Sequence, residues 1–377
     1  MRDAIIYSGW QWEAFNVPER MALAIAHAGG RVLYCENPVS RLRGDGRQFA
    51  KLAERVYGFG PVQIGGRLNR LPLLPQLQAR IVVEQILRHA AKLGLRDPIF
   101  IYAHGEGTLP VCLQMKREGF LLAHVCMDYP EPGQEEHVEI SDITLVIPRT
   151  VYHKLRARFG TKVFLTPQSV CLFASVPENA DPPDAPDCAE ISRPRLGYLG
   201  APQDRLNTRV VRELLANRPD WQFVSFGVTP GVQLPNLHVL KWRKPDKLPL
   251  IIAGLDVGFM PYDCFTDKNF HSVPLKVFDY FWAGIPVVAT PMVNLWQYEH
   301  LIYFGDTAEE IGRAVARALD EPRDSPKRKQ RMEIAAAHSI ENLSAVLEKI
   351  LGASAVAQPD SEPGGKYARP APYSAQT

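Results

Sequence analysis

Three features that define other classes of protein are missing from this 377-residue sequence. Its six cysteines stand singly, with no C-x-x-C pair of the kind that zinc and dithiol sites use, and this pattern is typical of a reducing compartment. No window holds about 18 uninterrupted apolar residues, so we expect no membrane-spanning helix. The first residues also lack the apolar core, about 7–15 residues long, of a signal peptide. Together these absences predict a cytoplasmic protein.

An excess of charge of one sign is missing as well. Forty-three Lys and Arg stand against 41 Asp and Glu, a formal net charge of +2. The sequence therefore offers no overall field for a polyanion, and we expect no nucleic-acid partner. What is present is an ordinary globular composition, with 46% hydrophobic and 22% charged residues. The length suits about two or three domains.

Short apolar runs alternate with helix-length segments in residues 1–175. The run Ala4–Tyr7 is typical of a buried strand, and Asn16 and Pro18 then provide the cap and the early proline of a helix. Helices between successive strands indicate a parallel sheet covered on both faces. The sequence thus predicts a first Rossmann-like domain over residues 1–175. Its other predicted strands are 31–35, 99–102, 123–127, 144–147 and 163–165.

A stretch rich in proline and acid, residues 176–194, shows no periodicity and is typical of a linker. After it the alternation resumes, which predicts a second Rossmann-like domain over 195–352, with its final helix a candidate to pack back on the first domain. Residues 353–377 are rich in Pro, Gly, Ser and Gln and predict a disordered tail. The fold class is α/β, with two doubly wound parallel sheets facing a central cleft. The predicted elements of the second domain are strands 195–200, 221–227, 237–240, 257–260 and 286–290, and helices 209–216, 308–319 and 328–351.

The segment 272–290 carries the most chemical information. Pro274 suits the first turn of a helix that Gly284 ends, so Lys276 and Asp279 lie three residues apart on one face near its start. A helix N-terminus with a lysine suits a diphosphate, and a carboxylate suits ribose hydroxyls. The alternative interpretation is a surface ion pair between Lys276 and Asp279 on an amphipathic helix.

This segment, with Pro274-Leu275-Lys276 followed by Asp279 and then Gly284-Ile-Pro-Val-Val-Ala-Thr, resembles the nucleotide-sugar-binding helix of GT-B glycosyltransferases. The resemblance is to group 1 (family 4-like) enzymes and bacterial exopolysaccharide glycosyltransferases in particular. It places Asp279 where the family has the second Glu of its E-x7-E motif, the ribose ligand. His271 stands where the first Glu is usual. This departure leaves open whether transfer retains or inverts the anomeric configuration.

The resemblance implies a GT-B fold with a donor site in the second domain and an acceptor-side loop in the first. The donor would be a nucleotide-diphosphate sugar, used as a substrate, and no cofactor is expected. The acceptor-side loop would contain Gly9 and Trp10. The implied donor-binding residues are Gly200, Arg205, Gly227, Tyr262, His271, Ser272, Val273, Pro274, Leu275, Lys276 and Asp279.

Two residues at strand ends are candidates for a catalytic base. Asp128 follows the apolar run 123–127, and ligands of open α/β sheets bind beyond the carboxyl ends of the strands. A carboxylate there suits removal of the acceptor's hydroxyl proton in an inverting transfer. Alternatively it forms a turn before Pro130. His104, after the run 99–102, is the competing base, although lone histidines are more often structural.

A strongly basic segment runs from Arg41 to Arg96. It holds eleven basic and three acidic residues, a local balance of +8, interleaved with leucines, Ile81 and Val82. This pattern resembles an interfacial surface that meets anionic lipid headgroups. The alternative interpretation is a solvated helix face. With a lipid-linked acceptor, the first domain would dock at the inner face of the cell membrane.

The sequence as a whole predicts a glycosyltransferase that moves a sugar to a hydroxyl of a carbohydrate or lipid-linked acceptor, in bacterial polysaccharide or glycolipid synthesis. No D-x-D triplet occurs, and we expect no metal. Two rivals stay open. One is a glycosyltransferase-like scaffold without turnover, motivated by His271 and Cys171. The other is an NAD-type oxidoreductase, which the lack of G-x-G-x-x-G after the first strand disfavours.

Overall fold

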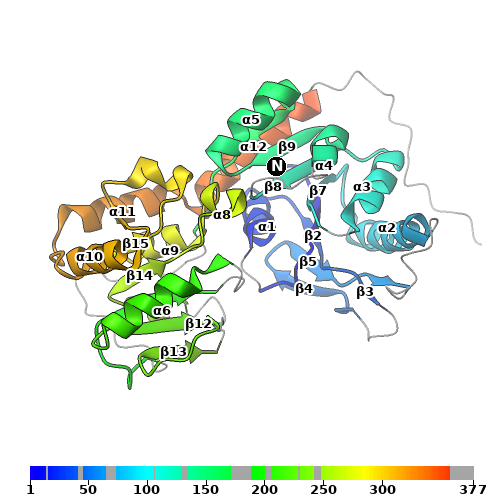
Figure 1. Ribbon diagram of the computed structural model, residues 1–377. Coiled ribbons are helices and arrows are strands. Elements are labelled where there is room, and N and C mark those ends of the chain that lie inside the picture. The colour runs from blue at the N-terminus through cyan, green and yellow to red at the C-terminus, as the bar shows by residue number, and fades with distance from the viewer. Residues whose placement is uncertain are drawn as a thin grey trace, which may run out of the picture.

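Two sheets of mainly parallel strands, each with helices packed on it, make up the computed structural model of the protein (Figure 1). The first sheet is built from strands between residues 4 and 165, and the second from strands between residues 195 and 304. The structure describes residues 1–13, 16–40, 46–64, 74–105, 107–128, 135–170, 188–200, 205–227, 230–241 and 248–356.

The first domain is built on an eight-stranded sheet. Its strands, with the small pair β3 and β6 beside it, are β1 (Ala4–Tyr7), β2 (Val32–Cys35), β3 (Val39–Ser40), β4 (Ala50–Ala53), β5 (Val56–Phe59), β6 (Val62–Gln63), β7 (Ile99–Ala103), β8 (Leu122–Cys126), β9 (Ile143–Val146) and β10 (Val163–Leu165). The order is β10-β9-β8-β7-β1-β2-β5-β4, with β4 antiparallel to β5 and the other described pairs parallel. The helices are α1 (Val17–His27), α2 (Leu74–Leu93), α3 (Thr108–Arg117), α4 (Glu135–Ile140) and α5 (Arg149–Phe159), with a 3-10 turn η2 (Gly160–Lys162).

The second domain has a six-stranded parallel sheet in the order β13-β12-β11-β14-β15-β16. This is the doubly wound order in which the first and fourth strands meet at the point where the winding reverses. Its strands are β11 (Arg195–Leu199), β12 (Gln222–Phe226), β13 (Leu237–Leu240), β14 (Val257–Met260), β15 (Val287–Ala289) and β16 (Ile302–Phe304). Its helices are α6 (Thr208–Asn217), α7 (Leu248–Ala253), α8 (Asp267–Phe270), α9 (Lys276–Trp282), α10 (Ala308–Leu319) and α11 (Pro326–Ala337), with a 3-10 segment η5 (Val293–Tyr298).

Local sequence signals explain the start of the first domain. Strand β1 is buried along its whole length because helices pack on both faces of the sheet. Asn16 caps α1, since its side-chain oxygen accepts a hydrogen bond from the N–H of Glu19 at 3.1 Å. These predictions are confirmed. Val82, expected on an interfacial surface, is instead in the core beneath α2, because it lies on the helix face turned to the sheet.

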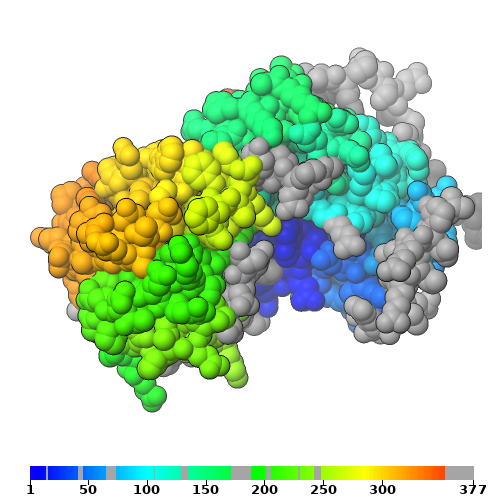
Figure 2. All heavy atoms as spheres, viewed as in Figure 1, coloured from blue at the N-terminus to red at the C-terminus, as the bar shows by residue number. Residues whose placement is uncertain are grey.

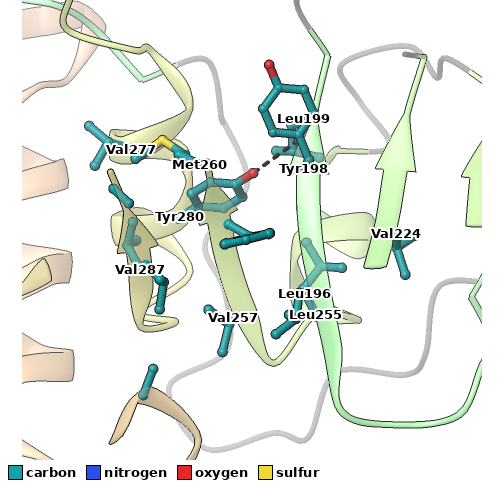
Figure 3. Close-up of a cluster of buried hydrophobic side chains, with 14 of the residues drawn as sticks. Leu196, Tyr198, Leu199, Val224, Leu255, Val257, Met260, Val277, Tyr280 and Val287 are labelled. Carbon is teal, nitrogen blue, oxygen red and sulfur yellow. Dashed lines mark hydrogen bonds between the residues drawn. The ribbon is translucent and has the colours of Figure 1, made fainter. Parts of the chain in front are cut away.

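Tyr280 connects helix α9 to the second sheet by two hydrogen bonds. The hydroxyl of Tyr280 donates to the carbonyl oxygen of Gly197 at 2.9 Å and accepts the N–H of Leu199 at 3.1 Å, the contact dashed in Figure 3. Its ring covers Gly258 of β14, where a Cβ would come within 2.4 Å of the ring, so the close approach requires glycine there. The start of α9 is therefore held beside the end of β11.

The single helix expected over 328–351 is wrong, because the structure has two helices there. Helix α11 ends at Ala337, and α12 (Ile340–Val356) follows after a break at His338. The carbonyl oxygen of His338 accepts the N–H of Val170 at 2.7 Å, so the break is tied to the first domain. Helix α12 then packs along α1 and adds Leu343, Leu347, Ile350 and Leu351 to the first domain's core.

Three of the sequence expectations fall wholly or partly outside the described residues. Of the linker 176–194 the structure describes 188–194 alone. Helix α12 continues to Val356, and the rest of the expected tail is not described. In the basic segment, residues 41–45 and 65–73 are likewise outside the described part. Among the helices that are described, none is long and apolar enough to cross a bilayer.

Candidate functional site

A cavity of about 320 Å³ lies between the two domains. In Figure 2 the surface is hollowed between the blue N-terminal segment and the green part of the second domain. Residues just beyond strand ends line the cavity from both sides: Trp10 follows β1, Asp128 follows β8, Gly200 follows β11 and Tyr262 follows β14. Both sheets therefore present their carboxyl edges to one space, where open α/β sheets bind ligands.

Most of the predicted site residues meet in this cavity. From the first domain come Trp10 and Asp128. From the second come Gly200, Arg205, Tyr262, Ser272, Val273, Pro274, Leu275, Lys276 and Asp279. Pro274 stands two residues before α9, which begins at Lys276, so the lysine and Asp279 are both in the first turn.

Lys276 is buried in a polar and aromatic cage. Its Nζ donates to the carbonyl oxygen of Gly200 at 2.7 Å and to the hydroxyl of Tyr262 at 3.2 Å, and it lies 3.9 Å from the ring centre of Tyr198. Burial, together with the positive charge of Arg205, lowers the pKa of Lys276 well below its usual value. Burial also raises the pKa of Tyr262 to about 12. Burial therefore disfavours the charged form of this lysine at the cavity wall, despite the two hydrogen bonds that it donates.

An ion pair crosses the cavity between Asp128 and Arg205. Nη2 of Arg205, from the second domain, lies 2.8 Å from Oδ2 of Asp128, from the first. Burial works against the charge of Arg205, but Asp128, Tyr262 and Tyr198 together raise the pKa of the guanidinium. Both side chains keep contact with solvent, at 15% and 28% exposure. The pair therefore lies where a ligand entering the cavity can reach it.

The alternative of a surface Lys276–Asp279 ion pair is wrong. Both residues are buried, at 7% and 4% exposure. The carboxylate of Asp279 lies instead 3.5 Å from Nη2 of Arg20 on α1 of the first domain. The second domain's helix α9 is consequently in electrostatic contact with the first domain.

Four predicted residues do not line the cavity. His104 turns toward β8, where its Nδ1 lies 3.2 Å from Nε2 of His124. The ring of His271 lies 2.9 Å from Oγ1 of Thr150, in a polar contact between the domains. Gly9 and Gly227 lie in the turns that follow β1 and β12. Their φ angles are 74° and 80°, a conformation that glycine adopts without strain.

Comparison with known proteins shows which fold this architecture belongs to. The search against family models found no match. A search of solved structures found sucrose-phosphate synthase from Thermosynechococcus elongatus, with a TM-score of 0.69 and 15% identity, covering 95% of this chain and 100% of that chain. It also found trehalose 6-phosphate synthase from Burkholderia multivorans, with a TM-score of 0.62 and 13% identity, over 95% and 100% of the two chains. The chain has the GT-B fold.

A sequence relative gives a second similarity for this GT-B chain. It is 28% identical over 153 residues to TuaH of Bacillus subtilis strain 168, named as a candidate teichuronic acid biosynthesis glycosyltransferase. The match covers 37% of this chain and 38% of that relative, so the chain matches well under half of the relative's length. The fold prediction is confirmed, and the similarity to TuaH agrees with the predicted activity class.

Several GT-B cavity residues were missed by the sequence reasoning. They are Asn16, Val17, Arg20, Met127, Gln168, Leu199 and Leu248. Asn16 was interpreted as a helix cap alone, although α1 begins directly after the loop at the carboxyl end of β1, where ligands of this fold class bind. The same rule was the signal that could have singled out Arg20. Gln168, whose Nε2 donates to the carbonyl oxygen of Val273 at 2.9 Å, is reached only through a contact between the domains.

Both domains contribute charged side chains to the cavity. The second domain contributes Arg205, Lys276 and Asp279, and the first contributes Arg20 and Asp128. This arrangement can hold a ligand that carries negative charge and hydroxyls together, with a carboxylate on the opposite wall. Among the described residues, no group of three or more His, Cys, Asp or Glu side chains is placed to hold a metal ion.

Proposed function

We propose that the protein is a glycosyltransferase that moves a sugar from a nucleotide-diphosphate donor to an acceptor hydroxyl. The observation that carries this proposal is the charge pattern of the GT-B cavity. Arg205 and Lys276 stand on the second domain's wall with Asp279, and Asp128 stands on the first domain's wall. The similarity of this chain to TuaH, which is named as a glycosyltransferase, supports the same activity.

The donor is proposed to bind to the second domain. Its diphosphate would lie against Lys276 and Arg205, because desolvated cations bind phosphate oxygens strongly. Asp279, in the same turn as Lys276, would accept hydrogen bonds from the ribose hydroxyls. These cations also stabilise the charge that develops on the leaving diphosphate, which supports transfer without a resident metal.

The acceptor is proposed to bind to the first domain, with Asp128 as the base of an inverting transfer. The acceptor hydroxyl gives its proton to Asp128 while its oxygen forms a bond to the anomeric carbon, and the bond from that carbon to the diphosphate oxygen breaks. Arg205, now paired with Asp128, is within reach of the same diphosphate. Donor binding would draw Arg205 away and leave the carboxylate free to accept the proton.

The acceptor class is proposed from the relative. TuaH is named for teichuronic acid biosynthesis, so we propose a carbohydrate or lipid-linked acceptor in bacterial polysaccharide or glycolipid synthesis. Such an acceptor would be met at the inner face of the cell membrane.

The activity is tested by a panel of UDP-, GDP- and dTDP-sugars. One of them should raise the melting temperature, because a ligand at a hundred times its Kd stabilises by about 2.7 kcal/mol. The same donor should release its nucleoside diphosphate when an acceptor is added, at a rate that EDTA leaves unchanged. Stabilisation by a donor without release under any acceptor would instead support the scaffold without turnover. Loss of release in EDTA would contradict metal independence.

We further propose that the outer face of α2 docks on anionic lipid. Arg80, Arg88 and Lys92 are exposed along this helix, with Leu77 at its start 48% exposed. Each basic residue near such a surface contributes about 1 kcal/mol. Vesicles with phosphatidylserine should therefore bind the protein in a salt-sensitive manner, and Arg80→Glu with Lys92→Glu should weaken the binding.

Sedimentation with these vesicles measures the effect. Lys329→Glu on α11, which changes a lysine of the second domain whose side chain is 83% exposed, is the matched control. Equal sedimentation with neutral and anionic vesicles would show that α2 has a solvated face only.

A further inference from the structure

Three arginines of the described residues are almost fully buried, and two of them are bound by protein oxygens. Arg331 donates to the carbonyl oxygens of Gly284 and Leu301 and pairs with Glu321. Arg195 donates to the carbonyl oxygens of Ile191 and Gly254. These two guanidinium groups lie away from the cavity and hold the second domain together, which is the usual role of a buried arginine.

The third, Arg20, differs from them in its partners. It extends from the first turn of α1, its side chain is 3% exposed, and it lines the cavity. Its Nε and Nη1 are buried and have no hydrogen-bond partner among the described residues. Its Nη2 lies 3.5 Å from Oδ2 of Asp279, a distance at the long end for an ion pair. Buried charged donors without acceptors are costly, so a group retained in this state points to a ligand.

We propose that Arg20 binds an oxyanion of the substrate, a carboxylate or a phosphate group, and so joins the first domain to the ligand. This inference rests on the proposed glycosyl transfer. A guanidinium offers a planar set of donors that matches two oxygens of one oxyanion. The charged residues that line the cavity are three cations, Arg20, Arg205 and Lys276, and two carboxylates, Asp128 and Asp279. Basic side chains therefore outnumber carboxylates in the cavity lining before any ligand is bound.

Arg20 is placed so that a ligand bound to it would bridge the two domains. Lys276 and Arg205 belong to the second domain, whereas Arg20 belongs to the first and reaches the turn of α9 that carries Asp279. An oxyanion bound to Arg20 while the nucleotide is bound to α9 bridges the two domains. Binding energy from this contact therefore favours the closed cleft, in which the acceptor and the anomeric carbon meet.

The oxyanion has two possible sources, the donor's diphosphate and an acidic group on a sugar. Calorimetry and an inhibition assay together separate them. The first arm titrates the nucleoside diphosphate that the wild type binds best among UDP, GDP and dTDP, and then inorganic pyrophosphate. The second arm measures inhibition of transfer by glucuronate and by glucose 6-phosphate, with glucose as the uncharged reference.

The variants are Arg20→Gln, which removes the charge, and Arg20→Lys, which keeps a charge opposite Asp279 but loses the planar set of donors. Arg20→Gln should weaken the anion that uses this site by about 10–100-fold, and Arg20→Lys by less. Arg313→Gln, which removes an arginine whose side chain is 60% exposed on α10 of the second domain, is the control and should change neither arm. Circular dichroism and melting curves establish that each variant is folded.

Each result either supports or overturns the role of Arg20. Weaker pyrophosphate and nucleotide binding in Arg20→Gln supports the inference and assigns the site to the diphosphate. Unchanged nucleotide binding with a selective loss of glucuronate or glucose 6-phosphate inhibition supports it and assigns the site to an acidic sugar. If both Arg20 variants bind every probe as the wild type does, the inference is overturned and the proposed function stands. If the wild type binds no nucleoside diphosphate at all, the proposed function itself fails.

Discussion

Replacing Asp128 by asparagine is expected to lower kcat by about 10²–10⁴-fold, the usual contribution of a general base. Donor affinity should not fall, because the donor is proposed to draw Arg205 away from residue 128, and a neutral amide holds Arg205 less strongly than the carboxylate that accepts its hydrogen bond at 2.8 Å. The substitution keeps the size of the side chain, so the fold should be unchanged. Initial rates of nucleotide release and calorimetry with the donor measure the two quantities separately.

His104 provides the control for this prediction, because it is the other base that the sequence suggests. Its ring contacts His124 and does not line the cavity, so His104→Gln should keep nearly full activity. The reverse pattern, a silent Asp128→Asn and an inactive His104→Gln, would make His104 the base. An NMR time course that shows the product with the donor's anomeric configuration would rule out inversion with either residue.

The fold could be predicted far along the chain because its signals are local. Strands such as β1 and β7 are continuous apolar runs, and they are so because parallel strands are buried on both faces. Strand β4 was missed because it is an edge strand with two exposed residues out of four, which leaves no apolar run. The break at His338 was missed because the contact found there is a hydrogen bond to Val170, a residue 168 positions earlier in the chain.

The candidate site was predicted more fully on the second domain's wall than on the first, where Trp10 and Asp128 were the only lining residues expected. The segment around Lys276 and Asp279 is contiguous in the sequence, so its motif was visible there. Arg20 lies in a different domain and meets Asp279 only after folding. The strand-end rule also gives the edge of a sheet but not the direction of a side chain. It selected Asp128 and His104 equally, and packing against His124 turns His104 away.

Replacing Lys276 by methionine is expected to weaken binding of the nucleoside diphosphate by about 10–100-fold, because a charged hydrogen bond to phosphate is lost. Methionine keeps the buried apolar stem, so the contact with the Tyr198 ring and the packing of α9 should survive. Binding of the nucleoside without phosphates should change little. Asp279→Ala should weaken nucleoside and nucleoside diphosphate alike, since the ribose is common to both. Lys329→Met, a change at an exposed lysine on α11, is the control.

The same lysine gives this prediction a pH dependence. Burial and the charge of Arg205 hold the pKa of Lys276 well below its usual value in the free protein, and a bound diphosphate should raise that pKa. Below the lowered pKa both states carry the charge, so affinity does not depend on this group. As pH rises through it, the free protein loses a proton that the complex keeps, and affinity falls. Calorimetry in two buffers of different ionisation enthalpy should then show proton uptake on binding in this pH range. Lys276→Met should abolish both the uptake and the fall in affinity, and a pH profile that is the same in wild type and variant would mean that Lys276 does not contact the phosphates.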